Sequence, residues 1–158
     1  MNDFVDLTRS LGEPRQPGPF FAQLDAVLKK RVGYILLTLL VVDGAEVVRL
    51  YTSDPASYPV SGRKPMTDTP WGDHVIKQGR SFLARDREGL RWAFYDHATI
   101  EALGGGSQIN VPIVYDGRCI GTVNLTHREH VYGPEHLAAV EELAPLLIPA
   151  FLQAAALR

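Results

Sequence analysis

The sequence has 158 residues, of which 46% are hydrophobic and 22% are charged, with a formal net charge of −2 and a single cysteine. These values are ordinary for a soluble globular protein, and the length suits one domain with a sizeable core. A single cysteine excludes an intrachain disulfide framework. The charge is spread along the chain without a Lys/Arg stripe that could neutralise phosphates, so we expect no nucleic-acid partner.

The N-terminal end is expected to differ from the rest of the chain. Pro14, Pro17 and Pro19 predict a short arm and a stiff linker over residues 1–19. The remaining residues, 20–158, are expected to form a single domain.

Neither a signal peptide nor a membrane helix is predicted. Residues 1–6 lack the basic and apolar regions of a signal peptide. The apolar run 34–42 is only about half as long as a membrane helix must be. We therefore expect a cytoplasmic protein without a membrane partner.

The first half of the domain predicts one helix and two strands. Apolar residues recur at helical spacing over 20–31, and Gly33 ends that helix. Residues 34–42 are apolar on both faces, which predicts a central strand. Asp43–Gly44 forms a turn into a second strand over 46–52.

The middle of the chain is irregular. Residues 53–70 contain four prolines, and a segment of this length in a compact domain often acts as a lid or a binding loop. A short helix is expected to open at Trp71, capped by Thr69. A short strand over 81–84 and one or two helical pieces within 88–103 complete the region.

Residues 108–126 predict a β-hairpin with two different faces. One face is apolar, and alternation places five small polar residues on the other. These are Gln108, Asn110, Thr122, Asn124 and Thr126. Either water or another part of the molecule covers this polar face, and the functional interpretation depends on which.

The turn of this hairpin decides which residues share a face. A two-residue loop at Asp116–Gly117 would set polar residues opposite apolar ones, whereas a three-residue loop that includes Tyr115 keeps the faces consistent. We therefore expect the three-residue loop, with Gly117 left-handed and Asn124 opposite Gln108.

The C-terminal region is helical from Pro134 to Ala156. Pro145 and Pro149 each remove a backbone hydrogen bond, so we expect a kink or a restart of the helix there. The region is apolar around much of its circumference, which is typical of an interface. We predict a homodimer that pairs helix 20–31 with helix 134–156 across a two-fold axis.

Three segments, 109–113, 116–125 and 132–137, together resemble the GAF domain family, and the resemblance covers residues 20–157. Their sequences are Ile-Asn-Val-Pro-Ile, Asp-Gly-Arg-Cys-Ile-Gly-Thr-Val-Asn-Leu and Tyr-Gly-Pro-Glu-His-Leu. The resemblance implies an α+β fold whose central antiparallel sheet carries the terminal helices on one face and a pocket under short helices and loops on the other. It also implies a non-catalytic sensory or regulatory domain in signal transduction that binds an as yet unidentified small molecule.

We expect apolar walls and a few hydrogen-bonding groups to line this pocket. The candidate ligand-binding residues are Trp71, His74, Trp92, Tyr95, His97, Gln108, Asn110, Thr122 and Asn124. The ligand is expected to be small and neutral or anionic, with Arg63, Lys64 or Arg91 as charge partners.

Two other classes of function stay open. One is an enzyme that uses the same cavity, such as a free methionine-R-sulfoxide reductase, a class similar in fold; it needs a reactive and a resolving cysteine, and Cys119 is alone, on the apolar face of the hairpin. The other is a dimerisation or interaction module with an empty pocket. His127, Glu129, His130 and His136 could suggest a metal, but solvent-exposed imidazoles explain them better, so we expect no catalytic residue, cofactor or metal.

Overall fold

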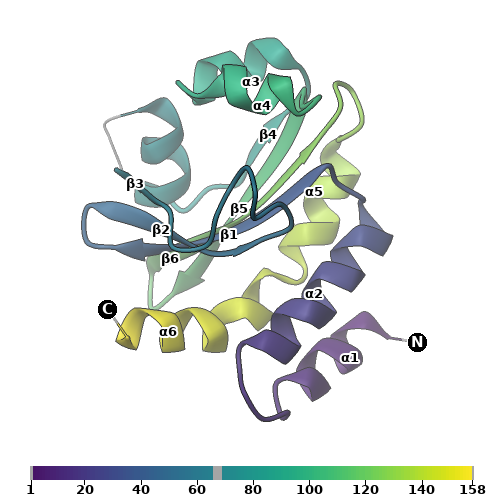
Figure 1. Cartoon of the computed structure of the whole chain (residues 1–158), viewed down its shortest axis with the longest axis vertical. Helices are drawn as coiled ribbons and strands as arrows, with labels where there is room; N and C mark the ends of the chain where they lie inside the picture. Colours follow the sequence, from purple (N-terminus) through teal and green to yellow (C-terminus); the bar gives the residue numbers. More distant parts are fainter. Residues whose placement is uncertain (1, 66–68, 158) are drawn as a thin grey trace.

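The computed structural model describes residues 2–65 and 69–157, and its centre is a six-stranded antiparallel sheet in the order β3-β2-β1-β6-β5-β4. The strands are β1 (Leu36–Asp43), β2 (Glu46–Thr52), β3 (Arg63–Pro65), β4 (Phe82–Ala84), β5 (Ser107–Tyr115) and β6 (Arg118–His127). Helices cover both faces (Figure 1). The expected α+β architecture is thus confirmed.

One face of the sheet carries the terminal helices (Figure 1). They are α1 (Asp3–Ser10), α2 (Gly18–Arg31), α5 (Pro134–Glu141), the 3₁₀ turn η2 (Ala144–Leu147) and α6 (Ile148–Ala156). The main core lies here, where Leu37, Leu39 and Val41 of β1 alternate inward beneath the helices. Gly121 of β6 permits the close approach of α6, because a Cβ at this position would lie 2.2 Å from the Phe151 ring.

The opposite face is covered by three short elements of the middle region: the π-helical segment η1 (Gly72–Lys77), α3 (Arg87–Ala93) and α4 (His97–Ala102). The Thr69 hydroxyl accepts a hydrogen bond from Gly72 N–H at 3.0 Å, which confirms the expected cap. Within the segment expected to be irregular, 53–70, residues Arg63–Pro65 form β3 against β2. Residues 66–68 of that segment lie outside the described residues.

The expectation of an arm over the first residues was wrong for Asp3–Ser10, which form helix α1. The Asn2 side chain caps it by accepting from Phe4 N–H at 2.9 Å, and Leu7 is fully buried in the main core. Asp3 bridges Lys30 and Arg31 at the end of α2, at 2.7 and 2.8 Å, and these two cations lower the pKa of its carboxyl. Pro14 and Pro17 lie in the connection between α1 and α2, and Pro19 lies in the first turn of α2.

The hairpin of β5 and β6 has the predicted faces but not the predicted turn. The turn has two residues, Asp116 and Gly117, with φ values of 51° and 75°. Asn124 therefore lies opposite Asn110, and not opposite Gln108 as expected. A β-bulge at Ile120 adds one residue to β6, so the polar residues of the two strands still share one face despite the two-residue turn. The same bulge places Cys119 on the face of Val114, so the expectation that it shares the apolar face with Gly121 was wrong.

The C-terminal helical region is broken twice, as its prolines predict. Pro145 lies in the first turn of η2 and Pro149 in the first turn of α6. Among the described residues, no single helix is long and apolar enough to cross a membrane. Within residues 2–65 and 69–157, one helix pair, Pro134–Glu141 and Ala144–Ala156, bent by 42°, reaches that length and composition together.

Candidate ligand-binding cavity

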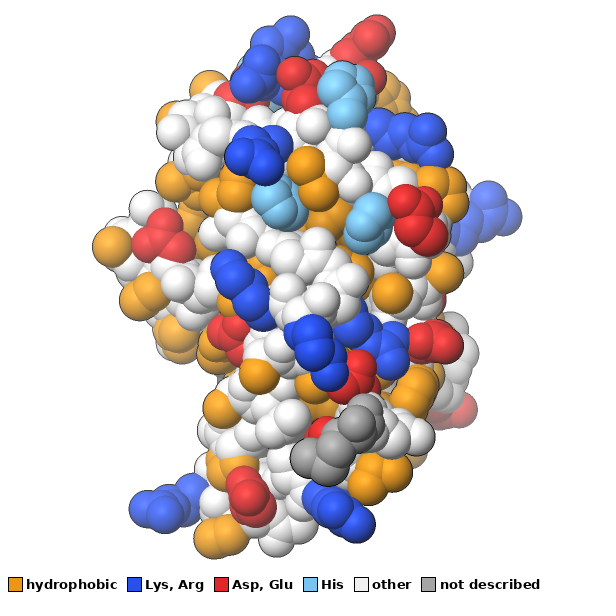
Figure 2. All heavy atoms as spheres, turned by 90° about the vertical axis from the view of Figure 1, so that its right-hand side faces the viewer, with side chains coloured by type: hydrophobic (Ala, Val, Ile, Leu, Met, Phe, Trp, Pro, Cys, Tyr) orange, Lys and Arg blue, Asp and Glu red, His pale blue; other side chains and the backbone are white. Residues whose placement is uncertain are grey.

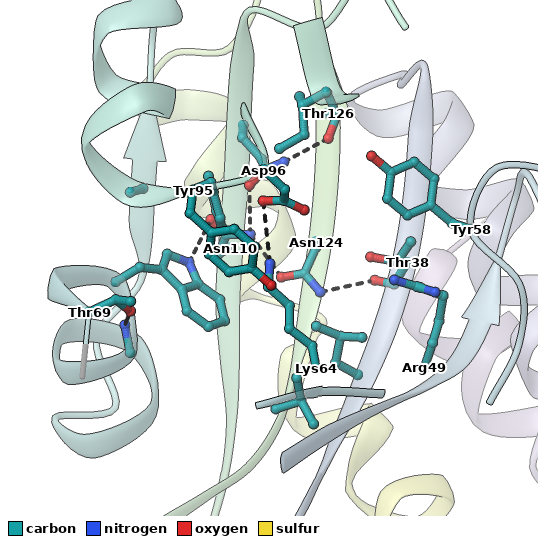
Figure 3. Close-up of a pocket in the computed structure, with 18 of the residues that line it drawn as sticks. Thr38, Arg49, Tyr58, Lys64, Thr69, Tyr95, Asp96, Asn110, Asn124 and Thr126 are labelled. Atoms are coloured by element: carbon teal, nitrogen blue, oxygen red, sulfur yellow. Dashed lines mark hydrogen bonds and ion pairs between the residues drawn. The ribbon is translucent and has the colours of Figure 1, made fainter. Parts of the chain in front are cut away.

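A cavity of about 100 Å³ lies between the polar face of the sheet and the segments that cover it. The strands β1, β5 and β6 form its floor, and residues of β2, the 53–62 loop, β3 and the segments around η1 and α3 enclose it (Figure 3). The polar face of the hairpin is therefore roofed by protein, and the C-terminal helix lies on the other side of the sheet.

The floor is a ladder of buried amide and hydroxyl groups. The two Nδ2 hydrogens of Asn110 are directed to Asn124 Oδ1 at 2.8 Å and Gln108 Oε1 at 3.2 Å. Asn124 Nδ2 donates in turn to Thr122 Oγ1 at 3.0 Å and to the Thr38 carbonyl at 3.4 Å. Because these hydrogens are already used, the ladder is a stiff floor with few donors left for a ligand.

The ladder is also tied to the roof and to the strand ends. The indole Nε1 of Trp71 donates to Asn110 Oδ1 at 3.1 Å, and Gln108 Nε2 donates to Thr126 Oγ1 at 2.8 Å. The ring of Trp71 in turn packs against Phe94, with centroids 5.7 Å apart. The hydrogen bond from Trp71 to Asn110 thus holds the start of η1 against β5.

The wall formed by β2 and the loop behind it is different. Arg49 donates from Nη1 to the Pro59 carbonyl at 2.9 Å, but its Nε is buried with no partner. The hydroxyl of Tyr58, whose ring lies 5.1 Å from the guanidinium, is also buried and unpaired. Of the described residues only three have a buried side-chain polar atom without a partner, and these two both line the cavity.

Regular alternation from the β1–β2 turn places Arg49 on the cavity face with Val47, and a β-bulge directly after it changes the face of Tyr51. Leu40 of β1 pairs with Arg49 whereas Leu39 pairs with Tyr51, so Leu50 is the extra residue. Because of this extra residue Tyr51 lies on the helix face, opposite Leu39, and bonds the Asp25 carboxylate of α2. Arg49 also anchors the loop through its backbone, which pairs with Ser61 and Gly62 at 2.8 and 3.0 Å.

The charges of the cavity do not cancel. Lys64 of β3 lies 3.5 Å from Asp96, and its ammonium group lies over the rings of Phe94 and Tyr95. Together with Arg49, the charged side chains of the described lining residues sum to one positive charge. Burial lowers the pKa of the Arg49 guanidinium and raises the pKa of the Tyr58 hydroxyl, which keeps that hydroxyl protonated as a donor.

The cavity brings together five of the nine residues expected to bind a ligand. They are Trp71, Tyr95, Gln108, Asn110 and Asn124, and the expected cation Lys64 joins them. The two other candidate cations form ion pairs elsewhere: Arg63 with Asp43 and Glu46, and Arg91 with Glu101.

The other four expected residues do not line the cavity. His74 contacts the Ser81 carbonyl at 2.8 Å, and His97 pairs with Glu101 at 3.1 Å. Trp92 stacks on Phe82 with 54% of its surface exposed, because it projects from the outer side of α3. Thr122 belongs to the polar face, but it is fully buried and supports Asn124.

Sequence reasoning missed Arg49 and Tyr58 as cavity residues. Arg49 interrupts an otherwise apolar run, Val47-Val48-Arg49-Leu50-Tyr51, and a lone charge in such a strand is a usable signal. Its face could not be assigned because Val47 and Val48, one on each face of the strand, are equally apolar. Tyr58 lies in an irregular loop without any periodicity.

The cysteine and the histidines lie outside the cavity lining. Cys119 lies beside the hairpin turn, outside the cavity lining, and burial raises the pKa of its thiol to about 11. His127 packs on Tyr132, and the Nδ1 of His136 accepts from Gly133 N–H at 3.0 Å. Over residues 2–65 and 69–157, no three His, Cys, Asp or Glu side chains are grouped as metal ligands.

A roofed cavity on the polar face of an antiparallel sheet, with terminal helices on the other face, is the arrangement that the sequence motifs predict. The family model that matches this chain is that of the GAF domain, over residues 24–150. The chain belongs to the GAF domain family. No curated protein sequence matches it.

Solved structures with the same fold come from proteins of different roles. The GAF domain of a two-component sensor histidine kinase from Bacillus halodurans superposes with a TM-score of 0.74 at 14% identity, covering 90% of this chain and 97% of that one. The GAF domain of a phosphoenolpyruvate-protein phosphotransferase from Coxiella burnetii gives 0.75 at 16% identity, with 98% and 93% covered. A free methionine-R-sulfoxide reductase from Neisseria meningitidis, in complex with its substrate, gives 0.73 at 21% identity, with 98% and 88% covered. At these identities the similarity establishes the fold.

Proposed function

We propose that this GAF domain is a non-catalytic sensory module that binds a small molecule in the cavity between its sheet and its roof. The observation that carries the proposal is the pair of buried, unpaired groups on one wall, Arg49 Nε and the Tyr58 hydroxyl. Buried polar groups in folded proteins nearly always have partners, and an orphan pair facing one cavity suggests a partner that binds there.

A sensory role fits how the cavity is enclosed. Its lining comes from segments far apart in the sequence, among them the 53–62 loop, β3, η1 and α3. A ligand that contacts all of them would favour the arrangement in which they are ordered together. The sheet would carry that change to the terminal helices, which pack on its other face. Structural neighbours from a sensor kinase and a chemotaxis protein support a role in signal transduction.

The proposal includes a cytoplasmic location, no membrane or nucleic-acid partner, and a homodimer formed through the terminal helices. On the face seen in Figure 2, acidic and basic side chains of the described residues are interspersed and no basic stripe crosses it. Apolar side chains that remain exposed on the helical side include Phe4, Val5 and Leu152. A monomeric mass in light scattering at micromolar concentration would overturn the dimer.

The reductase alternative is disfavoured by the position of Cys119. A nucleophilic cysteine needs a low thiol pKa and access to the substrate. Here burial raises the thiol pKa, and the side chain lies outside the lining of the cavity.

Native mass spectrometry of freshly purified protein tests the binding proposal. We expect a retained small molecule in the wild type and its loss in Leu40→Phe, which fills the cavity from β1. Leu152→Phe, the same change on the exposed side of α6, should retain the molecule. A bare wild-type protein, together with equal thermal responses of wild type and Leu40→Phe to a metabolite library, would favour an interaction module with an empty pocket.

A further inference from the structure

Resting on the proposed function, we propose that the ligand is a small organic monocarboxylate whose carboxylate binds Arg49 and Tyr58. Its short apolar body would lie between the sheet and the ring of Phe94. The inference names the chemical class of the ligand and the wall that recognises it. It rests on which hydrogen-bonding groups of the cavity are already used and which are not.

The first argument is the supply of free donors. Arg49 Nε and the Tyr58 hydroxyl are donors without an acceptor, whereas Asn110 and Asn124 have committed both of their amide hydrogens to the floor. A ligand atom that accepts two hydrogen bonds would meet both needs at once. Carboxylate oxygens accept several hydrogen bonds and match the planar guanidinium.

The second argument is charge. In the described part of the chain, Arg49 has no carboxylate at ion-pair distance, and the one acidic side chain of the lining, Asp96, lies against Lys64. The guanidinium is partly buried, and the attraction of Asp96, which is shared with Lys64, only partly offsets its desolvation, so a bound anion would stabilise it further. Because the described part of the lining carries one net positive charge, a monoanion balances it, whereas a phosphate dianion would leave an excess of negative charge.

The third argument is that the guanidinium is held in place before any ligand arrives. Its Nη1 donates to the Pro59 carbonyl, and its Cζ lies over the Tyr58 ring, 5.1 Å from the ring centroid. Gly62 provides the necessary space, since a Cβ there would lie 2.6 Å from Nη1. Figure 3 shows Arg49 and Tyr58 on the same side of the cavity, across from Asn110. A preordered pair of donors reduces the entropic cost of binding.

The fourth argument concerns the body of the ligand. The cavity of about 100 Å³ is below the range of roughly 300 to 1,000 Å³ that drug-sized ligands occupy. The walls beside Arg49 are apolar, with Leu40 and Val47 on the sheet and Phe94 and Ile100 on the roof. A short aliphatic or single-ring carboxylate fits both the size and the lining, whereas a nucleotide fits neither.

The test compares carboxylates with their own carboxamides on the full 158-residue chain. The probes are butanoate, hexanoate and benzoate, each beside its amide, with inorganic phosphate as a further anion. Titration calorimetry measures the dissociation constants, and thermal unfolding gives a second readout. We expect at least one carboxylate to bind about tenfold or more tightly than its amide, since a charge-assisted hydrogen bond contributes on this scale.

Variants assign the effect to the wall. Arg49→Met should weaken carboxylate binding about tenfold or more, and Tyr58→Phe by a smaller factor of about three to ten. Arg63→Met, an arginine of β3 whose ion pairs lie outside the cavity, should leave the dissociation constant unchanged. The comparison of carboxylate with amide on the wild type needs no variant, so it stands even where Arg49→Met folds poorly.

Each contrary result has a defined meaning. Equal binding of carboxylates and amides, or undiminished carboxylate binding by Arg49→Met, overturns the inference and leaves the proposed function standing. Phosphate binding tighter than every carboxylate overturns it in favour of a phosphate ligand. If no carboxylate binds the wild type, the inference fails, and a molecule retained in native mass spectrometry would still support the proposed function.

Discussion

The floor and the wall of the cavity differ in how far their buried hydrogen-bonding groups are satisfied within the protein. On the floor, Gln108, Asn110 and Asn124 hydrogen-bond to one another and to their neighbours, so the polar face of the hairpin is complete without a ligand. On the wall, Arg49 and Tyr58 carry buried donors that the protein leaves unpaired. The difference teaches that polarity alone does not locate a binding group, because what matters is the hydrogen-bonding capacity that remains unused.

The largest expected effect comes from breaking the floor. Asn110→Leu removes the partner of Trp71 Nε1, Gln108 Oε1 and Asn124 Oδ1 together, so we expect the free energy of unfolding in urea to fall by about 3 kcal/mol. The exposed amide Gln153 on α6 is the control, and Gln153→Leu should change it by less than about 0.5 kcal/mol. Similar values for the two variants would show that the ladder does not stabilise the fold.

A smaller effect is expected from the wall. Arg49→Met removes a hydrogen bond to Pro59 but also removes a buried, unpaired donor and its charge, and these contributions oppose each other. We expect the free energy of unfolding of ligand-free protein to stay within about 1 kcal/mol of wild type. A loss as large as that of Asn110→Leu would mean that Arg49 is a structural residue, and the contrast between floor and wall would fail.

The smallest expected changes in the free energy of unfolding concern two tyrosines, and they have opposite signs. Tyr58→Phe removes a buried hydroxyl that has no partner, so we expect stability to rise slightly, by up to about 0.5 kcal/mol. Tyr132→Phe removes a hydroxyl that donates to the Gly33 carbonyl at 2.5 Å, so we expect a loss of about 1 kcal/mol. Paired urea titrations measure both, and losses of equal size would indicate that the Tyr58 hydroxyl is already satisfied.

The sequence predicts the floor well because its residues alternate along two strands of one local hairpin. Alternation in each strand, with the requirement that the apolar residues of both strands share a face, places Asn110 and Asn124 together, and the cover of short helices follows from the family resemblance. The turn was predicted wrongly, yet the bulge at Ile120 compensates for it, so the composition of the faces is the same. Local patterns therefore determine which side chains share a face better than they determine which residues pair.

The wall could not be predicted for the opposite reason. Arg49 faces the cavity because it alternates with Val48 along β2, but Val47 on the same face is as apolar as Val48, so the sequence does not show which face of this strand is which. The roof raises a similar difficulty, since His74 and Trp92 lie on short helical segments whose rotation is set by tertiary packing on Phe82. Periodicity in such short segments is too brief to say which side faces inward.

The most direct test of the contrast is a ¹H–¹⁵N NMR spectrum that resolves the Nε–Hε signal of Arg49 and the side-chain amide signals of Asn110 and Asn124. Spectra of Arg49→Met and Asn110→Leu assign these signals. On addition of the small-molecule fraction of a cell extract, or of a carboxylate that binds, we expect the Arg49 signal to shift while the signals of the Asn110 and Asn124 amides remain in place. Movement of the floor amides with an unchanged Arg49 signal would contradict the account.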